Sequence, residues 1–168
     1  VLPATSPYAR NVTISDNTFT LGTGSSGTVS YPAITIAGSD GVTIFGNAVS
    51  SPGTTTSTGI EVTAATASGV VIRGNRIRGA GAGASRVGIS VALASGVRVE
   101  ANDLGTLATG ISIAATATGS RALDNAFATV TTPYSVLDTT TLFRHQAGLT
   151  FTTLPADVAD GSLVYCSD

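Results

Sequence analysis

Apolar residues in this chain alternate with small polar residues in short segments that recur along most of its length. One segment type reads Gly or Asn, apolar, any, apolar, any, any, Asn, any, apolar, and it recurs at residues 11–19, 41–49, 69–77, 96–104 and 119–127. The asparagines near the end of each copy are Asn17, Asn47, Asn75, Asn102 and Asn125. Alternation of this kind is typical of half-buried β-strands.

A second family of alternating segments lies between these copies, at residues 33–36, 59–62, 88–91, 110–113 and 133–136. Each repeat therefore contains at least two predicted strands. A single repeat offers too few inward side chains to bury its own apolar face, so the repeats must stack on one another. Equivalent positions would then form columns, as Ile34, Ile60, Ile89 and Ile111 do in one of them.

The asparagine column is best explained by the turn that follows the first strand of each repeat. Asn tolerates the left-handed backbone conformation that a tight turn needs. Stacked side-chain amides can also hydrogen-bond to one another from coil to coil. We therefore predict a structural role for these asparagines.

The motif G-V-x-I-x-x-N-x-I, seen in Gly69–Ile77, resembles the coils of the right-handed parallel β-helix repeat family. This family includes pectate lyases, polygalacturonases and the spike proteins of tailed bacteriophages. The resemblance covers residues 10–138 and implies an all-β fold, a right-handed single-stranded parallel β-helix. About five coils at strand spacing would make a rod about 25 Å long. Because enzymes of the family are longer, and the chain contains no Met, we expect a processed chain or a fragment.

The repeat fails after Asp138, which predicts two parts: residues 1–138 as parallel β-helix repeats and residues 139–168 as a C-terminal segment. An open solenoid end needs a cover that prevents end-to-end pairing. We expect the C-terminal segment to cap the stack or to pair with another chain. Residues 154–168 are similar to C-terminal segments of phage and prophage structural proteins.

Composition narrows the range of partners. Only 11% of the residues are charged, all eight basic residues are Arg, and the net charge is -2. This balance predicts no nucleic-acid partner, and the short apolar runs predict no membrane insertion. Cys166 is the only cysteine, so we expect no disulfide, no cysteine zinc site and no cofactor.

A cluster of charged residues, expected on one face of three adjacent coils, forms the candidate ligand-binding site: Arg73, Arg76, Arg98, Glu100, Asp103 and Arg121. Arg73 with Glu100, and Arg76 with Asp103, would be neighbours in one column, where opposite charges stabilise a sheet by roughly 0.2–1 kcal/mol. The same arginines could instead donate paired hydrogen bonds to carboxylates of an acidic polysaccharide. A subunit interface is the third interpretation, because arginine is enriched there.

Catalysis within this chain is less favoured than binding, and we assign no catalytic residue and no metal ligand. A glycosidase needs two carboxylates about 5–9.5 Å apart, which Glu100 with Asp103 or Asp124 could provide. Their arginine neighbours would keep Glu100 and Asp103 ionised, which opposes a role as general acid. No outward column holds the successive acids that a calcium-dependent lyase needs. His145 lies outside the repeats and is interpreted as a surface or capping residue.

The preferred hypothesis is a structural β-helical module of a phage or phage-derived spike or fibre, at the virion surface or outside the cell. It would bind a host-surface polysaccharide or receptor. By analogy with the family we expect a homotrimer that contacts other virion proteins, because the charge-poor surface has little to prevent lateral association. A flat outward column suits contact with a β surface or with sugar: Thr35, Glu61, Ser90, Ser112 and Ser135. The alternatives are a secreted polysaccharide lyase or glycoside hydrolase, and a bacterial surface adhesin.

Overall fold

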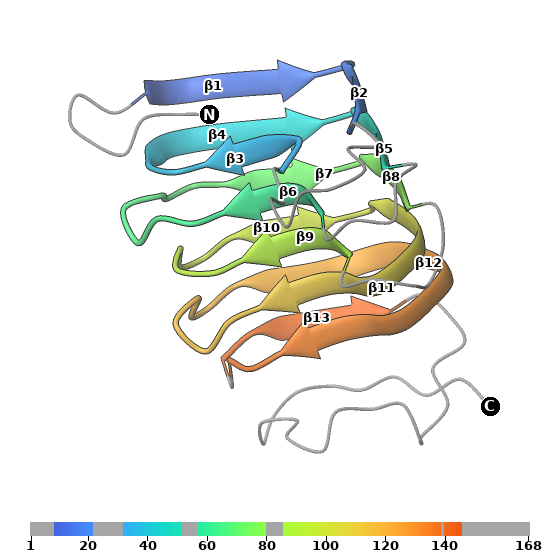
Figure 1. Cartoon of the computed structure of the whole chain (residues 1–168). Helices are drawn as coiled ribbons and strands as arrows, with labels where there is room; N and C mark the ends of the chain where they lie inside the picture. The colour runs from blue at the N-terminus through green and yellow to red at the C-terminus, as the bar shows by residue number, and fades with distance from the viewer. Residues whose placement is uncertain (1–8, 22–31, 52–56, 80–85, 139, 146–168) are drawn as a thin grey trace.

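The chain is a stack of parallel β-strands wound into a solenoid (Figure 1). The computed structural model describes residues 9–21, 32–51, 57–79, 86–138 and 140–145. These residues contain 13 strands and no helix, and every strand pair among them is parallel. The prediction of an all-β parallel solenoid is therefore confirmed.

The strands form three stacks, and each turn of the chain adds a strand to each stack. The first stack contains β1 (Ala9–Ser15), β4 (Ser39–Phe45), β7 (Val71–Arg73), β10 (Arg98–Glu100), the start of β12 (Arg121–Val136) and β13 (Leu142–His145). The second contains β2 (Thr18–Thr20), β5 (Ala48–Ser51), β8 (Arg76–Gly79), the start of β11 (Asp103–Ile113) and the middle of β12. The third contains β3 (Ile34–Ile36), β6 (Thr58–Val62), β9 (Val87–Val91) and the ends of β11 and β12.

The number of turns is slightly smaller than the sequence predicts. Five asparagines mark equivalent points on successive coils, and they bound about four turns rather than five coils. The last repeats are also shorter, because β11 and β12 run through the corner between the second and third stacks without a break. Thr106 and Thr129, with φ of 57° and 58°, turn the chain there.

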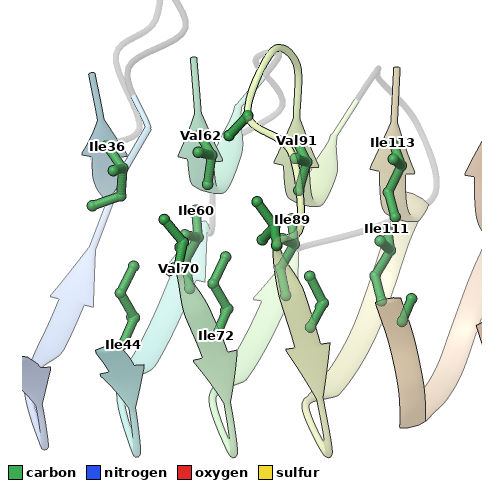
Figure 2. Close-up of a cluster of buried hydrophobic side chains, with 14 of the residues drawn as sticks. Ile36, Ile44, Ile60, Val62, Val70, Ile72, Ile89, Val91, Ile111 and Ile113 are labelled. Atoms are coloured by element: carbon green, nitrogen blue, oxygen red, sulfur yellow. The ribbon is translucent and has the colours of Figure 1, made fainter. Parts of the chain in front are cut away.

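The core consists of aliphatic columns that face one another across the inside of the coil (Figure 2). Ile60, Ile89 and Ile111 lie in register on adjacent coils and are 0% exposed. Burying one such side chain contributes roughly 1.5–3 kcal/mol. Because an inward residue on one coil contacts its equivalents above and below, the predicted columns are the unit of packing.

The asparagines form a hydrogen-bonded ladder at the corner between the first and second stacks. The Oδ1 atom of Asn75 accepts from the backbone N and the Nδ2 of Asn47, each at 3.0 Å. The Nδ2 of Asn75 in turn donates to the Ile44 carbonyl of the preceding coil at 3.0 Å. Equivalent amide bonds join Asn17 to Asn47, Asn75 to Asn102 and Asn102 to Asn125. The predicted amide ladder is therefore confirmed.

The left-handed residues of this corner are not the asparagines of the ladder, so that part of the prediction was wrong. Positive φ values of 51–66° belong to the residue before each one, namely Asp16, Gly46, Gly74, Ala101 and Asp124. The sharp change of direction occurs one residue early because the asparagine amide must point inward to reach the ladder. Ala101 is the residue in this column for which the conformation is most strained, since it has a Cβ and no polar side chain.

The column of glycines at the start of the third stack changes at β12. A Cβ on Gly59, Gly88 or Gly110 would lie 2.6 Å from a carbonyl oxygen of the following coil. Pro133 continues this glycine column on β12. The next residue, Tyr134, packs edge-to-face on Phe127 with ring centroids 4.9 Å apart. Residues 146–168, and with them most of the predicted capping segment, lie outside the described residues.

The phenol of Tyr134 lies at the last step of the ladder. Burial is the main cause that raises its pKa to about 12, and its hydroxyl hydrogen-bonds to the side chain of Asn125. On β12 the aliphatic column of the third stack thus continues in an aromatic residue that fills the core and hydrogen-bonds to Asn125.

Replacing Ala101 with Gly is expected to stabilise the protein by about 1 kcal/mol, because glycine adopts positive φ without a steric penalty. Urea denaturation followed by circular dichroism would measure the change. Ala122→Gly is the control, since Ala122 is fully buried in the first stack and its loss of contacts should destabilise the fold. A lower midpoint for Ala101→Gly would contradict the assignment of strain to this corner.

Replacing Asn75 with Ala is expected to lower the free energy of unfolding by about 2–4 kcal/mol, because buried donors of Asn47 lose their acceptor. Asn17→Ala is the matched control at the exposed end of the ladder, where no preceding asparagine of the ladder is described. It should cost about 1 kcal/mol or less. Equal losses in urea denaturation would show that the ladder does not carry this stability.

Candidate functional site

The six predicted site residues lie in two groups, one on each side of the asparagine corner. Arg73, Arg98, Glu100 and Arg121 belong to the first stack, whereas Arg76 and Asp103 belong to the second. The single face expected from the sequence is thus divided, because the chain turns between Arg73 and Arg76.

In the first group, Arg98 holds the carboxylate of Glu100. Its Nε and Nη2 donate to Oε1 and Oε2 at 2.9 and 3.1 Å. The two residues lie two positions apart on β10 and therefore point to the same side of the sheet. This fork-on-fork geometry is the paired arrangement that arginine makes with carboxylates.

The predicted ion pair between Arg73 and Glu100 was wrong, although the two residues are neighbours in register. The guanidinium of Arg73 lies over the Phe45 ring instead, with its carbon 5.6 Å from the ring centroid. Such cation–π contacts contribute roughly 0.5–1 kcal/mol at exposed sites. Arg121 lies beside Arg98, and within the described parts of the chain no carboxylate pairs with it.

In the second group, the predicted neighbour relation between Arg76 and Asp103 is confirmed, but Asp103 binds another arginine more closely. The Nε of Arg76 lies 4.0 Å from Asp103 Oδ2. Arg78 donates its Nη1 to the Asp103 carbonyl at 3.0 Å and its Nη2 to the carboxylate. It can do so because Gly105 has no side chain, and a Cβ there would lie 3.0 Å from Arg78.

Arg78 is a site residue that the sequence reasoning missed. It lies two positions after Arg76 on β8, so period-two alternation places both arginines on one side of the sheet. The sequence does show this alternation. However, comparison of equivalent positions in successive repeats matched Arg76 with Asp103 and Arg78 only with Gly105, which cannot form an ion pair.

A hollow of about 170 Å³ lies on the outer side of the second stack, lined by Thr18, Ala48, Val49, Ser50, Arg76 and Arg78. It exists because β5 places the small residues Ala48 and Ser50 beside the two long arginines of β8. Asp103 is outside this lining, and its bond to Arg78 fixes one wall.

The outward column of the third stack has the register that the sequence predicts. Thr35, Glu61, Ser90, Ser112 and Ser135 follow one another on successive coils, and all of them are half-buried. Apart from Glu61 their side chains are short, so the surface of this face is nearly flat.

The described residues offer binding groups rather than an evident reaction centre. Glu100 and Asp103 are each bound by a guanidinium. No group of three His, Cys, Asp or Glu in the described ranges could hold a metal ion. The backbone of His145 is paired with Asn125 across β12 and β13, and Cys166 lies outside the described residues. No helix in the described part of the chain is long and apolar enough to span a membrane.

A family model described as the right-handed β-helix region matches residues 5–135. The match covers most of the chain, so this protein belongs to the right-handed β-helix family. No curated protein and no solved structure is similar enough to the chain to count as a match.

Proposed function

We propose that the chain is a structural β-helical module of a phage or phage-derived spike or fibre that binds polysaccharide at a host surface. The observation that carries this proposal is the concentration of arginine on the outer side of β7, β8, β10 and β12. The surface elsewhere is poor in charge, since only 11% of all residues are charged.

The charge balance of this region supports an anionic or strongly polar ligand. Five arginines lie there, namely Arg73, Arg76, Arg78, Arg98 and Arg121, against the carboxylates Glu100, Asp103 and Asp124. Five positive and three negative charges give +2, whereas the whole chain carries -2. Planar guanidinium groups recognise carboxylates by paired hydrogen bonds, and Arg98 already binds Glu100 in this way.

A binding role also agrees better with the carboxylates than a hydrolytic one does. A general acid must give up a proton, but Glu100 and Asp103 accept hydrogen bonds from arginine. A spike or fibre needs a stiff rod. The repeated coils provide one, and their outer columns place side chains at a fixed spacing. The proposed location is the virion surface or the extracellular space, in contact with other virion proteins.

Replacing Arg98 and Arg121 together with Ala is expected to weaken polysaccharide binding about tenfold, because two exposed cations are removed from the first stack. A glycan array followed by titration of the best ligand would measure this, with circular dichroism to confirm an unchanged β spectrum. Arg10→Ala is the control, an exposed arginine of the same stack on β1. Unchanged affinity in the double variant, or release of sugar products by the wild type, would contradict the proposal.

The proposed trimer would form through the flat outward column of the third stack. Light scattering coupled to size-exclusion chromatography is expected to give the mass of three chains at micromolar concentration. Ser112→Arg should shift the protein to monomers, because it places a long charged side chain on this face. Thr43→Arg, on the outer side of β4 in the first stack, should leave the trimer intact. A monomeric wild type would remove this part of the proposal.

A further inference from the structure

The N-terminal end of the stack has an open edge around the asparagine corner. Within the described parts of the chain, β1 pairs only with β4 and β2 only with β5. Each of the two strands therefore presents one edge of its backbone away from the stack, at the top of Figure 1. The third stack differs, since Ile34 and Ile36 of β3 are 5% and 0% exposed. The open edge is thus confined to β1 and β2, which we call the open corner.

The apolar columns of the core are incompletely covered at the open corner. Val12 and Ile14 are half-buried, whereas their register partners on β4, Val42 and Ile44, are 0% exposed. Phe19 of β2 is also half-buried, and its register partner on β5 is 3% exposed. A segment that extended these columns by one coil would bury apolar surface of all three side chains, which is favourable.

The asparagine ladder has a direction, and the open corner holds its acceptor end. In each described step the backbone N and the Nδ2 of one asparagine donate to the Oδ1 of the next, as Asn17 donates to Asn47 at 3.0 and 3.1 Å. Among the described ladder asparagines, Asn17 is the one whose Oδ1 accepts from no described residue, and Asn17 is exposed. The open corner can therefore accept one further pair of amide donors.

These features specify the segment that fits the open corner. It must place two alternate apolar residues over Val12 and Ile14, an asparagine over Asn17 and an apolar residue over Phe19. Any other register would bring polar side chains onto the core columns. The required spacing is apolar, any, apolar, any, any, Asn, any, apolar, which is the spacing of the repeat itself. Strand addition at a sheet edge gains affinity from main-chain hydrogen bonds and specificity from alternate side chains.

The described C-terminal end of a second copy does not offer this segment. The last strand there is β13, and the residue in register with Asn125 is His145, which has no side-chain amide. The other ladder asparagines already donate to the following coil of their own chain: Asn17, Asn47, Asn75 and Asn102. The missing amide must therefore come from another kind of chain.

We infer that the open corner is a docking site for a different β-helical chain, which contributes a coil with an asparagine at the ladder position. This coil lies parallel to β1 and β2, and its asparagine donates to Oδ1 of Asn17. The docking site is separate from the arginines of the proposed polysaccharide-binding surface and does not depend on them.

The test is fluorescence anisotropy of a labelled peptide of residues 41–51, which carries the required spacing, titrated with the full chain. One peptide is expected to bind per chain. Asn47→Asp in the peptide should weaken binding about tenfold, because a carboxylate replaces the amide that donates to Asn17. Thr43→Asp is the control with the same charge at an outward position, and it should bind like the original peptide. No binding of the original peptide, or equal binding of the Asn47→Asp peptide, would overturn the inference.

Variants of the full chain locate the peptide. Asn17→Ala removes the terminal acceptor, and Ile14→Lys places a charge at the open end of a core column, so each should weaken binding about tenfold. Thr13→Ala is the matched control, because Thr13 lies on the same strand with an exposed, outward side chain. Circular dichroism confirms that each variant is folded. Unchanged binding by Asn17→Ala and Ile14→Lys would place the peptide elsewhere and contradict the docking site.

Sedimentation velocity of the wild type and of Asn17→Ala distinguishes a different chain from a second copy. End-to-end growth of the wild type with concentration, abolished by Asn17→Ala, would show that the occupant is a second copy and would overturn the assignment to a different chain. An assembly state that Asn17→Ala leaves unchanged, together with specific binding of the peptide, supports docking of a different chain.

Discussion

The asparagine ladder is the interaction on which the rest of this structure depends. Backbone hydrogen bonds between parallel strands can form in many registers, and a shift of one residue would move every inward side chain to the outside. Only one register places an asparagine Oδ1 where the backbone N and the Nδ2 of the coil above can both reach it, as Asn75 does for Asn47. The ladder therefore fixes the aliphatic columns of the core, and repeats of different length are tolerated because they differ elsewhere.

The same corner decides how the charged residues are presented. The ladder turns the chain between Arg73 and Arg76, so the charged residues expected to form one cluster lie in two groups on different stacks. Each group then forms an ion pair of its own. Arg98 binds Glu100 in the first stack, and Arg78 binds Asp103 in the second. The positive charge that remains is exposed on a surface with few other charges.

Two columns of the third stack change residue type at β12. The residues that permit close stacking are glycines at the start of the third stack, and the last member of that column is Pro133. At the same level the aliphatic column ends in Tyr134, which packs on Phe127 and hydrogen-bonds to Asn125.

The sequence by itself determined the strand repeat, the inward columns and the amide ladder, because these depend on period-two alternation and on residues that recur at equivalent positions. It placed Arg76 beside Asp103 correctly for the same reason. Only the tertiary structure decided that Arg73 packs on Phe45, that Arg78 crosses Gly105 to reach Asp103, and that small residues of β5 leave a hollow. Long side chains choose among several neighbours within reach, and that choice depends on the space that adjacent coils leave free.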